Sequence, residues 1–236
     1  MTLSELLVDL KARIGSDPEV TDAKMTTWIN RALLVFCNEQ DWSWLETSTV
    51  DSTIADQQSY DLPSDYGRLV ELQVDGSASS PNPYTLVPWE QRVLAVAGAT
   101  QVSIYGGKYY LYPIPTTSGT NNIDIYYVKN PTRMTDSSDS PSDADIANMP
   151  ERYHEALVIY AFAIYNTYDE EHAEAESLMG SVNSPRPGTY YYFVDLAKRD
   201  DAQQKRGERA RMLSKQEFVG YSYPNATNAT TTVLGN

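Results

Sequence analysis

The spacing of apolar residues changes twice along the chain, and this change constrains the fold more than any other feature of the sequence. Up to about residue 44 the apolar side chains recur three or four positions apart, which is the period of a helix. From about 45 to 130, Thr, Val, Ile and Tyr stand at near-alternating positions between Gly, Pro, Asn and Asp, which is typical of strands. The helical period then returns. The sequence therefore predicts an α+β protein, a helical bundle with an inserted antiparallel β module.

Four helices are expected outside the strand-like region. They cover residues 2–14, 22–40, 150–180 and 194–218. Asp22 is the expected cap of the second helix, and Pro150 suits the first turn of the third, where no backbone N–H is needed. Apolar residues surround the third helix between 156 and 165, so we expect it to be central and buried.

The strand-like region is expected to form five strands and one short helix. The strands cover residues 46–54, 67–75, 100–105, 108–112 and 122–129, and the helix covers 87–98. The stretch "YGGKYYLYP" is typical of a hairpin that turns at Gly106 and Gly107. In "IDIYYV", alternation places Ile123 and Ile125 on one face of the strand and Tyr126 on the other.

These boundaries predict how the 236 residues are organised, a length that suits one large domain or two small ones. The expected segments are a helical bundle domain made of residues 1–44 and 149–218, an inserted β module at 45–130, a polar loop at 131–148, and an extended C-terminal arm at 219–236. No internal repeat is evident.

The chain is strongly acidic, with a formal net charge of −14, but the charge is unevenly spread. Residues 196–219 hold seven basic and four acidic side chains, whereas residues 1–195 hold 11 basic and 28 acidic ones. Wrapping of nucleic acid requires basic surface that releases counterions, so this balance argues against it. An acidic wall repels DNA, which is useful where DNA must slide without sticking.

Cysteine content and apolar run lengths indicate the compartment. The single cysteine, Cys37, cannot form an internal disulfide and fits a reducing environment. The N-terminal stretch carries charges throughout, unlike a signal peptide. The longest apolar run, "ALVIYAFAIY", has ten residues, far fewer than the roughly 20 that span a bilayer. We expect a soluble protein made in the cytoplasm.

Two carboxylate–histidine pairs with i, i+3 spacing are the strongest candidates for a metal site. They are Glu151 with His154 and Asp169 with His172. Both pairs fall on one predicted helix, about 27 Å apart at 1.5 Å per residue, so they cannot share a metal ion. We therefore expect them on a solvated helix face. His154 also begins a zinc-protease pattern, but position 158 is valine where a second histidine is needed.

The remaining chemistry-bearing residues do not form a recognisable site. Asp136, Asp139, Asp143 and Asp145 lack the spacing of a calcium-binding loop and are expected in a hydrated loop. With two histidines far from Cys37, a Cys–His or Ser–His centre lacks support, and no phosphate-binding glycine loop is present. We expect no catalytic residue, no metal and no cofactor.

The C-terminal stretch "VGYSYPNATNATTTVLGN" contains no charged side chain, although solubilising tails are normally charged. Its β-branched residues favour extended backbone, and its aromatic residues can anchor such a segment on a partner. The alternative is a frayed terminus. We expect docking, carried by an arm with Tyr221, Tyr223, Pro224, Val233 and Leu234, and by an assembly helix with Arg206, Arg209, Arg211 and Lys215.

Four stretches in this order resemble the head-to-tail adaptor, connector or head-completion proteins of tailed bacteriophages. They are "TWINRALLVFCNEQDWSWLE", "YDLPSDYGRLVELQV", "LYPIPTTSGTNNIDIYYVKNPTRMT" and "MPERYHEALVIYAFAIYNTYDEEHAEAE". Each is weak alone, and their order and spacing across about 150 residues carry the resemblance. One departure is "SVNSPRPGTYYYFV", which separates the last two helices more than expected and leaves the path of the final helix open.

The resemblance implies a structural, non-enzymatic protein of the virion neck. Such adaptors form a twelve-subunit ring beneath the portal, with helices around a DNA channel and a C-terminal arm that runs onto the portal. The implied partners are the portal protein, downstream tail or nozzle proteins and further copies of the chain. Genomic DNA would pass through the channel without sequence-specific binding.

Two alternatives remain open at this point. The first is a carbohydrate-binding β module of a phage tail or receptor-binding protein, in which exposed tyrosines stack on sugars. The second is a hydrolase that uses paired carboxylates, because the separation of carboxylates in space is not visible in a sequence.

Overall fold

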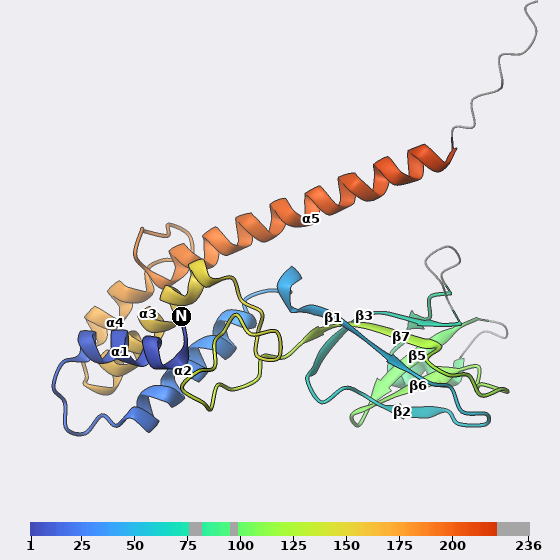
Figure 1. Cartoon of the computed structure of the whole chain (residues 1–236), viewed down its shortest axis with the longest axis horizontal. Coiled ribbons are helices and arrows are strands. Elements are labelled where there is room, and N and C mark those ends of the chain that lie inside the picture. The colour runs from blue at the N-terminus through green and yellow to red at the C-terminus, as the bar shows by residue number, and fades with distance from the viewer. Residues whose placement is uncertain (76–81, 95–98, 221–236) are drawn as a thin grey trace, which may run out of the picture.

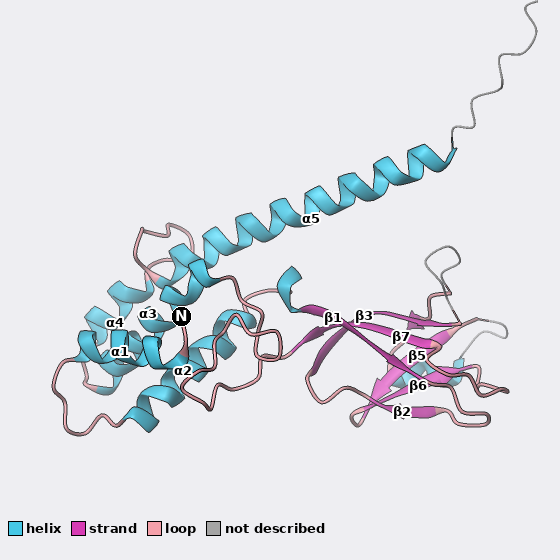
Figure 2. Ribbon diagram, viewed as in Figure 1, coloured by secondary structure: helices cyan, strands magenta, loops and turns pink. Residues whose placement is uncertain are grey.

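The computed structural model has an α+β architecture, with helices gathered at one end of the molecule and strands at the other (Figures 1 and 2). It describes residues 1–75, 82–94 and 99–220, except for the side chains of residues 93–94 and 207–220. The predicted α+β class and the strand-rich middle of the chain are confirmed.

The described part of the chain holds five α-helices. They are α1 (Leu3–Ile14), α2 (Asp22–Cys37), α3 (His154–Tyr168), α4 (His172–Met179) and α5 (Tyr190–Gly220). The N-terminus of α1 is a capping box, because Thr2 Oγ1 accepts from the Glu5 N–H at 3.3 Å and the Glu5 carboxylate accepts from the Thr2 N–H at 2.8 Å. Helix α2 is capped by Thr21, one residue before the expected cap.

The expected third helix is two helices, which is why there are five rather than four. It is interrupted at residues 169–171, where Glu170 has a φ of 64° that an α-helix cannot contain. The Glu171 N–H donates to the Asn166 carbonyl at 2.7 Å and closes the turn. The last helix begins at Tyr190, four residues earlier than expected, and runs for 31 residues. Its path, which the sequence left open, leads away from the other helices (Figure 1).

The strands form two sheets. The first has the order β1-β7-β3, and the second has the order β2-β6-β5-β4. The bounds are β1 (Glu46–Asp51), β2 (Ser59–Asp61), β3 (Tyr66–Val74), β4 (Thr85–Leu86), β5 (Gln101–Tyr105), β6 (Lys108–Tyr112) and β7 (Ile123–Lys129). All described pairings are antiparallel except β4 with β5.

The five predicted strands are present, with β2 and β4 in addition. Both were missed because they are only three and two residues long, too short to show alternation. The hairpin between β5 and β6 is confirmed, and its two glycines take φ values of 60° and 76°. The short helix expected at 87–98 is a 3-10 helix, η2 (Trp89–Leu94).

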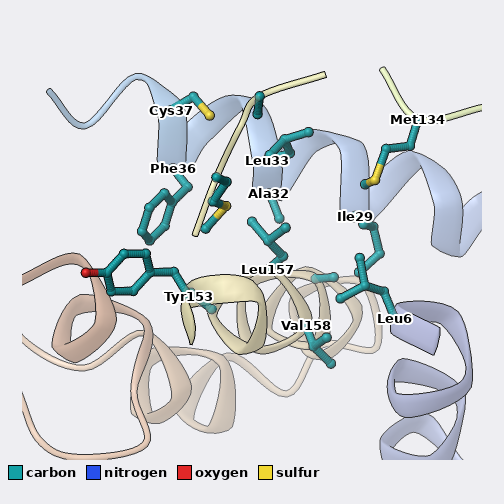
Figure 3. Close-up of a cluster of buried hydrophobic side chains, with 14 of the residues drawn as sticks. Leu6, Ile29, Ala32, Leu33, Phe36, Cys37, Met134, Tyr153, Leu157 and Val158 are labelled. Atoms are coloured by element: carbon teal, nitrogen blue, oxygen red, sulfur yellow. The ribbon is translucent and has the colours of Figure 1, made fainter. Parts of the chain in front are cut away.

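The first hydrophobic core lies between the helices. Figure 3 shows Leu157 of α3, and Tyr153 of the 3-10 helix η3 (Glu151–Tyr153) that precedes it, reaching toward the face of α2 that carries Phe36. Helix α3 is buried on nearly every side between Ala156 and Ala163, as its all-round apolar pattern predicts. Here the sequence pattern and the structure agree.

The segment 131–148 contributes to this core although it contains no helix or strand. Met134, Ile146 and Ala147 are buried in it. The Asn30 side chain of α2 holds the segment in place, because its amide donates to the Met134 carbonyl at 2.9 Å and its oxygen accepts from the Met134 N–H at 2.8 Å. The expected polar loop is thus polar in composition but packed.

The second core lies between the two sheets. Leu72 and Ile125 come from the first sheet, and Leu111 and Tyr109 come from the second. The Tyr109 hydroxyl donates to the Asp51 carboxylate at 2.8 Å, which ties β6 to β1 across the sandwich. Burial and this hydrogen bond raise the pKa of Tyr109 well above its usual value.

Candidate assembly surfaces

The base of α5 is fixed to the helical core by one buried stripe. Tyr190, Val194, Ala197 and Asp201 follow each other at helical spacing, and each is at most 3% exposed. The first three pack in the first core beside the end of α2. Asp201 is the last residue of α5 for which the structure gives a buried side chain. From residue 202 onward the helix projects beyond this stripe.

Asp201 is an acid that serves as a structural acceptor. Its carboxylate accepts from the Ser43 N–H at 2.8 Å and from the Gln40 amide at 3.0 Å, and it lies 3.1 Å from Lys205 Nζ. Lys205 also donates to the Asp41 carbonyl at 2.6 Å. These bonds clamp α5 to the segment that connects α2 with the first strand.

A second acid, Asp200, binds the same helix to the 3-10 helix η3 (Glu151–Tyr153), which precedes α3. Its carboxylate accepts from the Tyr153 hydroxyl at 2.6 Å and lies 3.0 Å from Arg152. Burial, helped by this bond, raises the pKa of the Tyr153 hydroxyl. Sequence reasoning assigned neither acid a role, because their partners lie far away in the chain. The sequence does contain a signal for the burial of Asp201, which continues the three-to-four-residue spacing of the buried Tyr190, Val194 and Ala197.

The basic residues near the base of α5 are paired within the chain. Lys198 lies 3.5 Å from Glu39, Arg199 lies 2.6 Å from Asp195, and Lys205 bonds to Asp201. Arg206 is exposed, and the ion pairs found among the described side chains do not include it.

The other residues expected to mediate assembly lie outside what can be described. The side chains of Arg209, Arg211 and Lys215 are on the part of α5 whose backbone alone is described. The arm residues Tyr221, Tyr223, Pro224, Val233 and Leu234 lie beyond residue 220.

The expectation that His154 lies on a solvated helix face is wrong. The side chain is fully buried, with Nδ1 3.0 Å from the N-terminal nitrogen of Met1 and Nε2 3.0 Å from Ser142 Oγ. Glu151 lies 3.0 Å from the same nitrogen. Burial, reinforced by the nearby ammonium charge, lowers the pKa of His154. The group joins the chain's first residue to α3 and the packed loop.

The other candidate metal ligands do not converge. Asp169 ends α3 and His172 begins α4, so this pair spans the break between two helices. Asp139 and Asp143 use their carboxylates to accept backbone N–H groups of the loop, from Asp136 at 2.8 Å and from Ser140 at 2.7 Å. Among the residues that the structure describes, no three His, Cys, Asp or Glu side chains are placed to hold a metal ion.

Aromatic residues of the second sheet form a cluster with η2. Trp89 of η2 stacks on Tyr105 with ring centres 4.6 Å apart, and Arg92 lies over the Trp89 ring at 3.8 Å. Tyr110 approaches Trp89 at 4.7 Å. Of this cluster, Tyr105 keeps a large exposed area, at 57%.

No α-helix in the described ranges is both long and apolar enough to cross a membrane. The histidines and acids that the sequence singled out for chemistry lie apart from one another and hold the fold together. The most prominent surface feature in the described ranges is the projecting half of α5.

Comparison with known proteins gives a family match that covers most of the chain. The family described as "SU10 adaptor protein" matches residues 1–212. Among solved structures, a chain of "Neck of empty GTA particle computed with C6 symmetry" is 11% identical, over 84% of this chain and 88% of that chain, with a TM-score of 0.31. No curated protein matches this chain. The assignment rests on the family match, which confirms the resemblance to adaptor proteins: the chain belongs to the SU10 adaptor protein family.

Proposed function

We propose that this adaptor is a structural protein of a bacteriophage neck that forms a ring, binds the portal and connects the DNA-filled head to the tail. The observation that carries this proposal is the family match over residues 1–212. The ring is expected to hold twelve subunits and to dock tail or nozzle proteins on its far side. The protein would act without catalysis or cofactor, in the virion, after synthesis in the host cytoplasm.

The shape of the chain supports a role for its C-terminus in portal binding. Helix α5 is anchored as far as Lys205 and then continues to Gly220, roughly 22 Å further at 1.5 Å per residue. Figure 1 shows this half leaving the rest of the molecule. Residues 219–236 follow from its far end, so the arm starts at a distance from its own subunit. We assign portal docking to the arm, and assembly contacts to the basic residues of the helix.

The organisation into separate parts is also a proposal. Residues 1–44 with 149–218 would act as the ring-forming domain and residues 45–130 as the module that meets tail proteins. Two hydrophobic clusters that share no residue support this division. The net charge of −14 supports a channel through which DNA slides without binding.

The carbohydrate-binding alternative has less support. A sugar platform needs an aromatic ring with an open face, and both Arg92 and Tyr105 lie against the Trp89 ring. If the adaptor proposal failed, binding of the protein to sugars on glycan arrays would favour this alternative.

The test is native mass spectrometry of the chain mixed with the portal protein of its phage. The full chain is compared with a chain that ends at Phe218. We expect the full chain to add to the portal ring in stoichiometric amounts and the shortened chain to lose this addition, because the arm is missing.

Binding that survives the truncation would contradict the role of the arm and leave the adaptor proposal in place. Failure of the full chain to bind an intact portal ring would contradict the proposed function itself.

A further inference from the structure

Strand β1 leaves one edge of the first sheet open. It pairs with β7 on one side, and no hydrogen bond among the described residues reaches the backbone of Ser48 or Val50 from the other side. The strand is six residues long, contains no proline, glycine, lysine or arginine, and pairs with β7 without a bulge. Natural proteins use such features to protect their edges, because unpaired N–H and C=O groups bind other extended chains. A regular edge that lacks this protection is typical of a binding surface.

The other edges of the two sheets are short, irregular or covered. Strand β3 has two register shifts, and its Leu72 carbonyl already accepts from the Tyr84 N–H at 2.7 Å. Strands β2 and β4 are only three and two residues long. Within the described part of the β module, β1 is therefore the longest regular edge open to a partner.

The register shows which backbone groups of β1 face this open edge. Because the Leu72 carbonyl points away from β7, the Leu72–Ile125 pair is not hydrogen-bonded, and Ile125 directs its N–H and C=O toward β1. Its partner on β1 is Thr49. Since the direction of these groups alternates along a strand, Ser48 and Val50 present their N–H and C=O groups to the open edge.

The side chains beside this edge favour a partner strand that is apolar and basic. Val50 is 55% exposed, and Tyr126 on the same outer face of the sheet is 41% exposed. Asp124 pairs with Val50 and Glu71 pairs with Tyr126, so both acids lie on that face. The ion pairs found among the described side chains include neither acid. Residues 45–130 as a whole hold nine acidic and four basic side chains.

A second copy of this chain matches the edge poorly. Strand β1 carries an acid at each end, Glu46 and Asp51, and the short edge strand β2 ends in Asp61. Two β1 strands side by side would bring acids of the two copies close together, which is destabilising. The net charge of −14 adds to this repulsion. The charges therefore favour a different and more basic protein as the occupant.

We propose that a strand of the downstream tail or nozzle protein adds to the open edge of β1, bonds to the backbone of Ser48 and Val50, and places basic side chains beside Asp124 and Glu71. This contact rests on the proposed function, in which residues 45–130 meet tail proteins, and it names the surface that they meet. Backbone pairing supplies the affinity, and the alternating side chains supply the choice of partner.

The first test removes single N–H donors from the open edge. Ser48→Pro and Val50→Pro each delete a donor that β7 does not use, so the ladder within the sheet stays intact. Portal rings loaded with the adaptor are mixed with the tail or nozzle protein of the same phage, and native mass spectrometry measures the bound tail protein. Each variant should weaken tail binding at least about ten-fold, because a hydrogen bond is lost and the proline ring blocks the added strand.

The matched control places proline on another open edge. Ser59 of β2 also faces outward, because its neighbour Gln58 accepts from the Leu111 N–H of β6 at 2.9 Å. Ser59→Pro should leave tail binding unchanged, and all three variants should add to the portal ring like the unaltered chain, which reports that they fold. Tail binding that survives both β1 substitutions, or that the control weakens equally, would overturn the proposed contact.

The second test needs no substitution and follows amide hydrogen exchange along β1 at single-residue resolution. In the adaptor ring on the portal, the Thr49 amide should exchange slowly because it bonds to β7, whereas the amides of Ser48 and Val50 should exchange rapidly. Binding of the tail protein should slow both to the rate of Thr49. Slow exchange before the tail protein is added would mean that a second copy or the portal holds the edge, and it would overturn the proposal.

The outcomes separate this contact from the function on which it rests. Tail binding that neither protects Ser48 and Val50 nor responds to proline would overturn the contact and leave the adaptor function standing. Failure of the tail protein to bind portal rings loaded with the unaltered chain would overturn the proposed connection to the tail, and this contact with it.

Discussion

The helical core and the β core reach the same degree of burial by different means. The helical core is filled by aliphatic side chains and by stacked rings, such as Phe36 on Trp42 at 5.5 Å. The β core is smaller and relies on tyrosines whose hydroxyls bond to carboxylates, as Tyr109 does to Asp51 and Tyr127 does to Asp65 at 2.8 Å. The helical core contains one bond of this kind, from Tyr153 to Asp200, among many apolar contacts, whereas the smaller β core contains two and therefore depends more on specific polar bonds.

This difference is in keeping with the proposed division into a ring-forming part and a part that meets tail proteins. The aliphatic core that anchors the long α5 helix is stabilised by many non-directional contacts. The tyrosine-based core fixes the positions of short strands that have little area to bury. The two cores should thus respond differently to substitution, to pH and to loss of the contacts between them.

The largest expected effect is the loss of a large aliphatic side chain from either core. Leu157→Ala in the helical core and Leu72→Ala in the β core should each lower the free energy of unfolding by about 2–5 kcal/mol, because both side chains are fully buried. Far-UV circular dichroism at 222 nm follows the helices. Fluorine NMR of the chain labelled with 5-fluorotryptophan, with all four tryptophans kept, follows the β module through the signal of Trp89.

If the cores are independent, Leu157→Ala lowers the unfolding midpoint of the circular dichroism signal and leaves the midpoint of the Trp89 signal unchanged. Leu72→Ala then lowers only the midpoint of the Trp89 signal. A single shared transition in both variants would show that the two cores unfold as one unit.

The contrast between these cores was only partly visible in the sequence. The all-round apolar run in α3 and the alternation in β7 predicted the central helix and the central strand, because both patterns extend over enough residues to be periodic. The break at Glu170 was missed, since a positive φ at a glutamate has no sequence signal. The partners of Asp201 and His154 were missed because they come from residues far away in the chain.

The second prediction concerns two buried tyrosines with opposite surroundings. Tyr109→Phe should destabilise the β core by about 2 kcal/mol, because the Asp51 carboxylate loses its hydroxyl donor. The Tyr190 hydroxyl in the helical core is buried and has no hydrogen-bond partner among the described residues, so Tyr190→Phe should leave stability unchanged or raise it slightly. Chemical denaturation of the two variants, followed by the same two signals, measures the difference. An equal loss of unfolding free energy in both variants would show that the two hydroxyls contribute alike, against this prediction.

The third prediction is that moderate acid weakens the helical core selectively. Burial lowers the pKa of His154 in the folded protein, whereas an unfolded histidine titrates near about 6.5. The unfolded chain then binds a proton that the folded chain does not. Stability should fall as the pH drops below about 6.5, by up to roughly 1.4 kcal/mol per pH unit, until the folded pKa is reached.

His154→Gln should remove this slope while His172→Gln, at an exposed position, should keep it. Thermal unfolding between pH 7 and pH 5 measures both. A slope that persists in His154→Gln, or one that appears equally in the Trp89 signal, would assign the acid response to other groups.

The smallest expected effect tests whether the two cores depend on each other at all. Arg68 of β3 donates a hydrogen bond to Asp41 at 3.1 Å, and its Nη2 lies 2.7 Å from the same carboxylate, so the pair links the strands to the segment after α2. Both side chains are more than half exposed, at 57% and 53%, so solvent screens the pair and Arg68→Ala should cost less than about 1 kcal/mol. Unfolding in low and in high salt measures this cost. The control is Lys108→Ala, which removes the exposed pair with Asp61 inside the β module.

A loss of stability well above that of the control, shared by the helical and the Trp89 transitions, would mean that the ion pair couples the two cores. A small and local loss would mean that each core is stable by itself, which an adaptor needs if one end assembles before the other meets its partner.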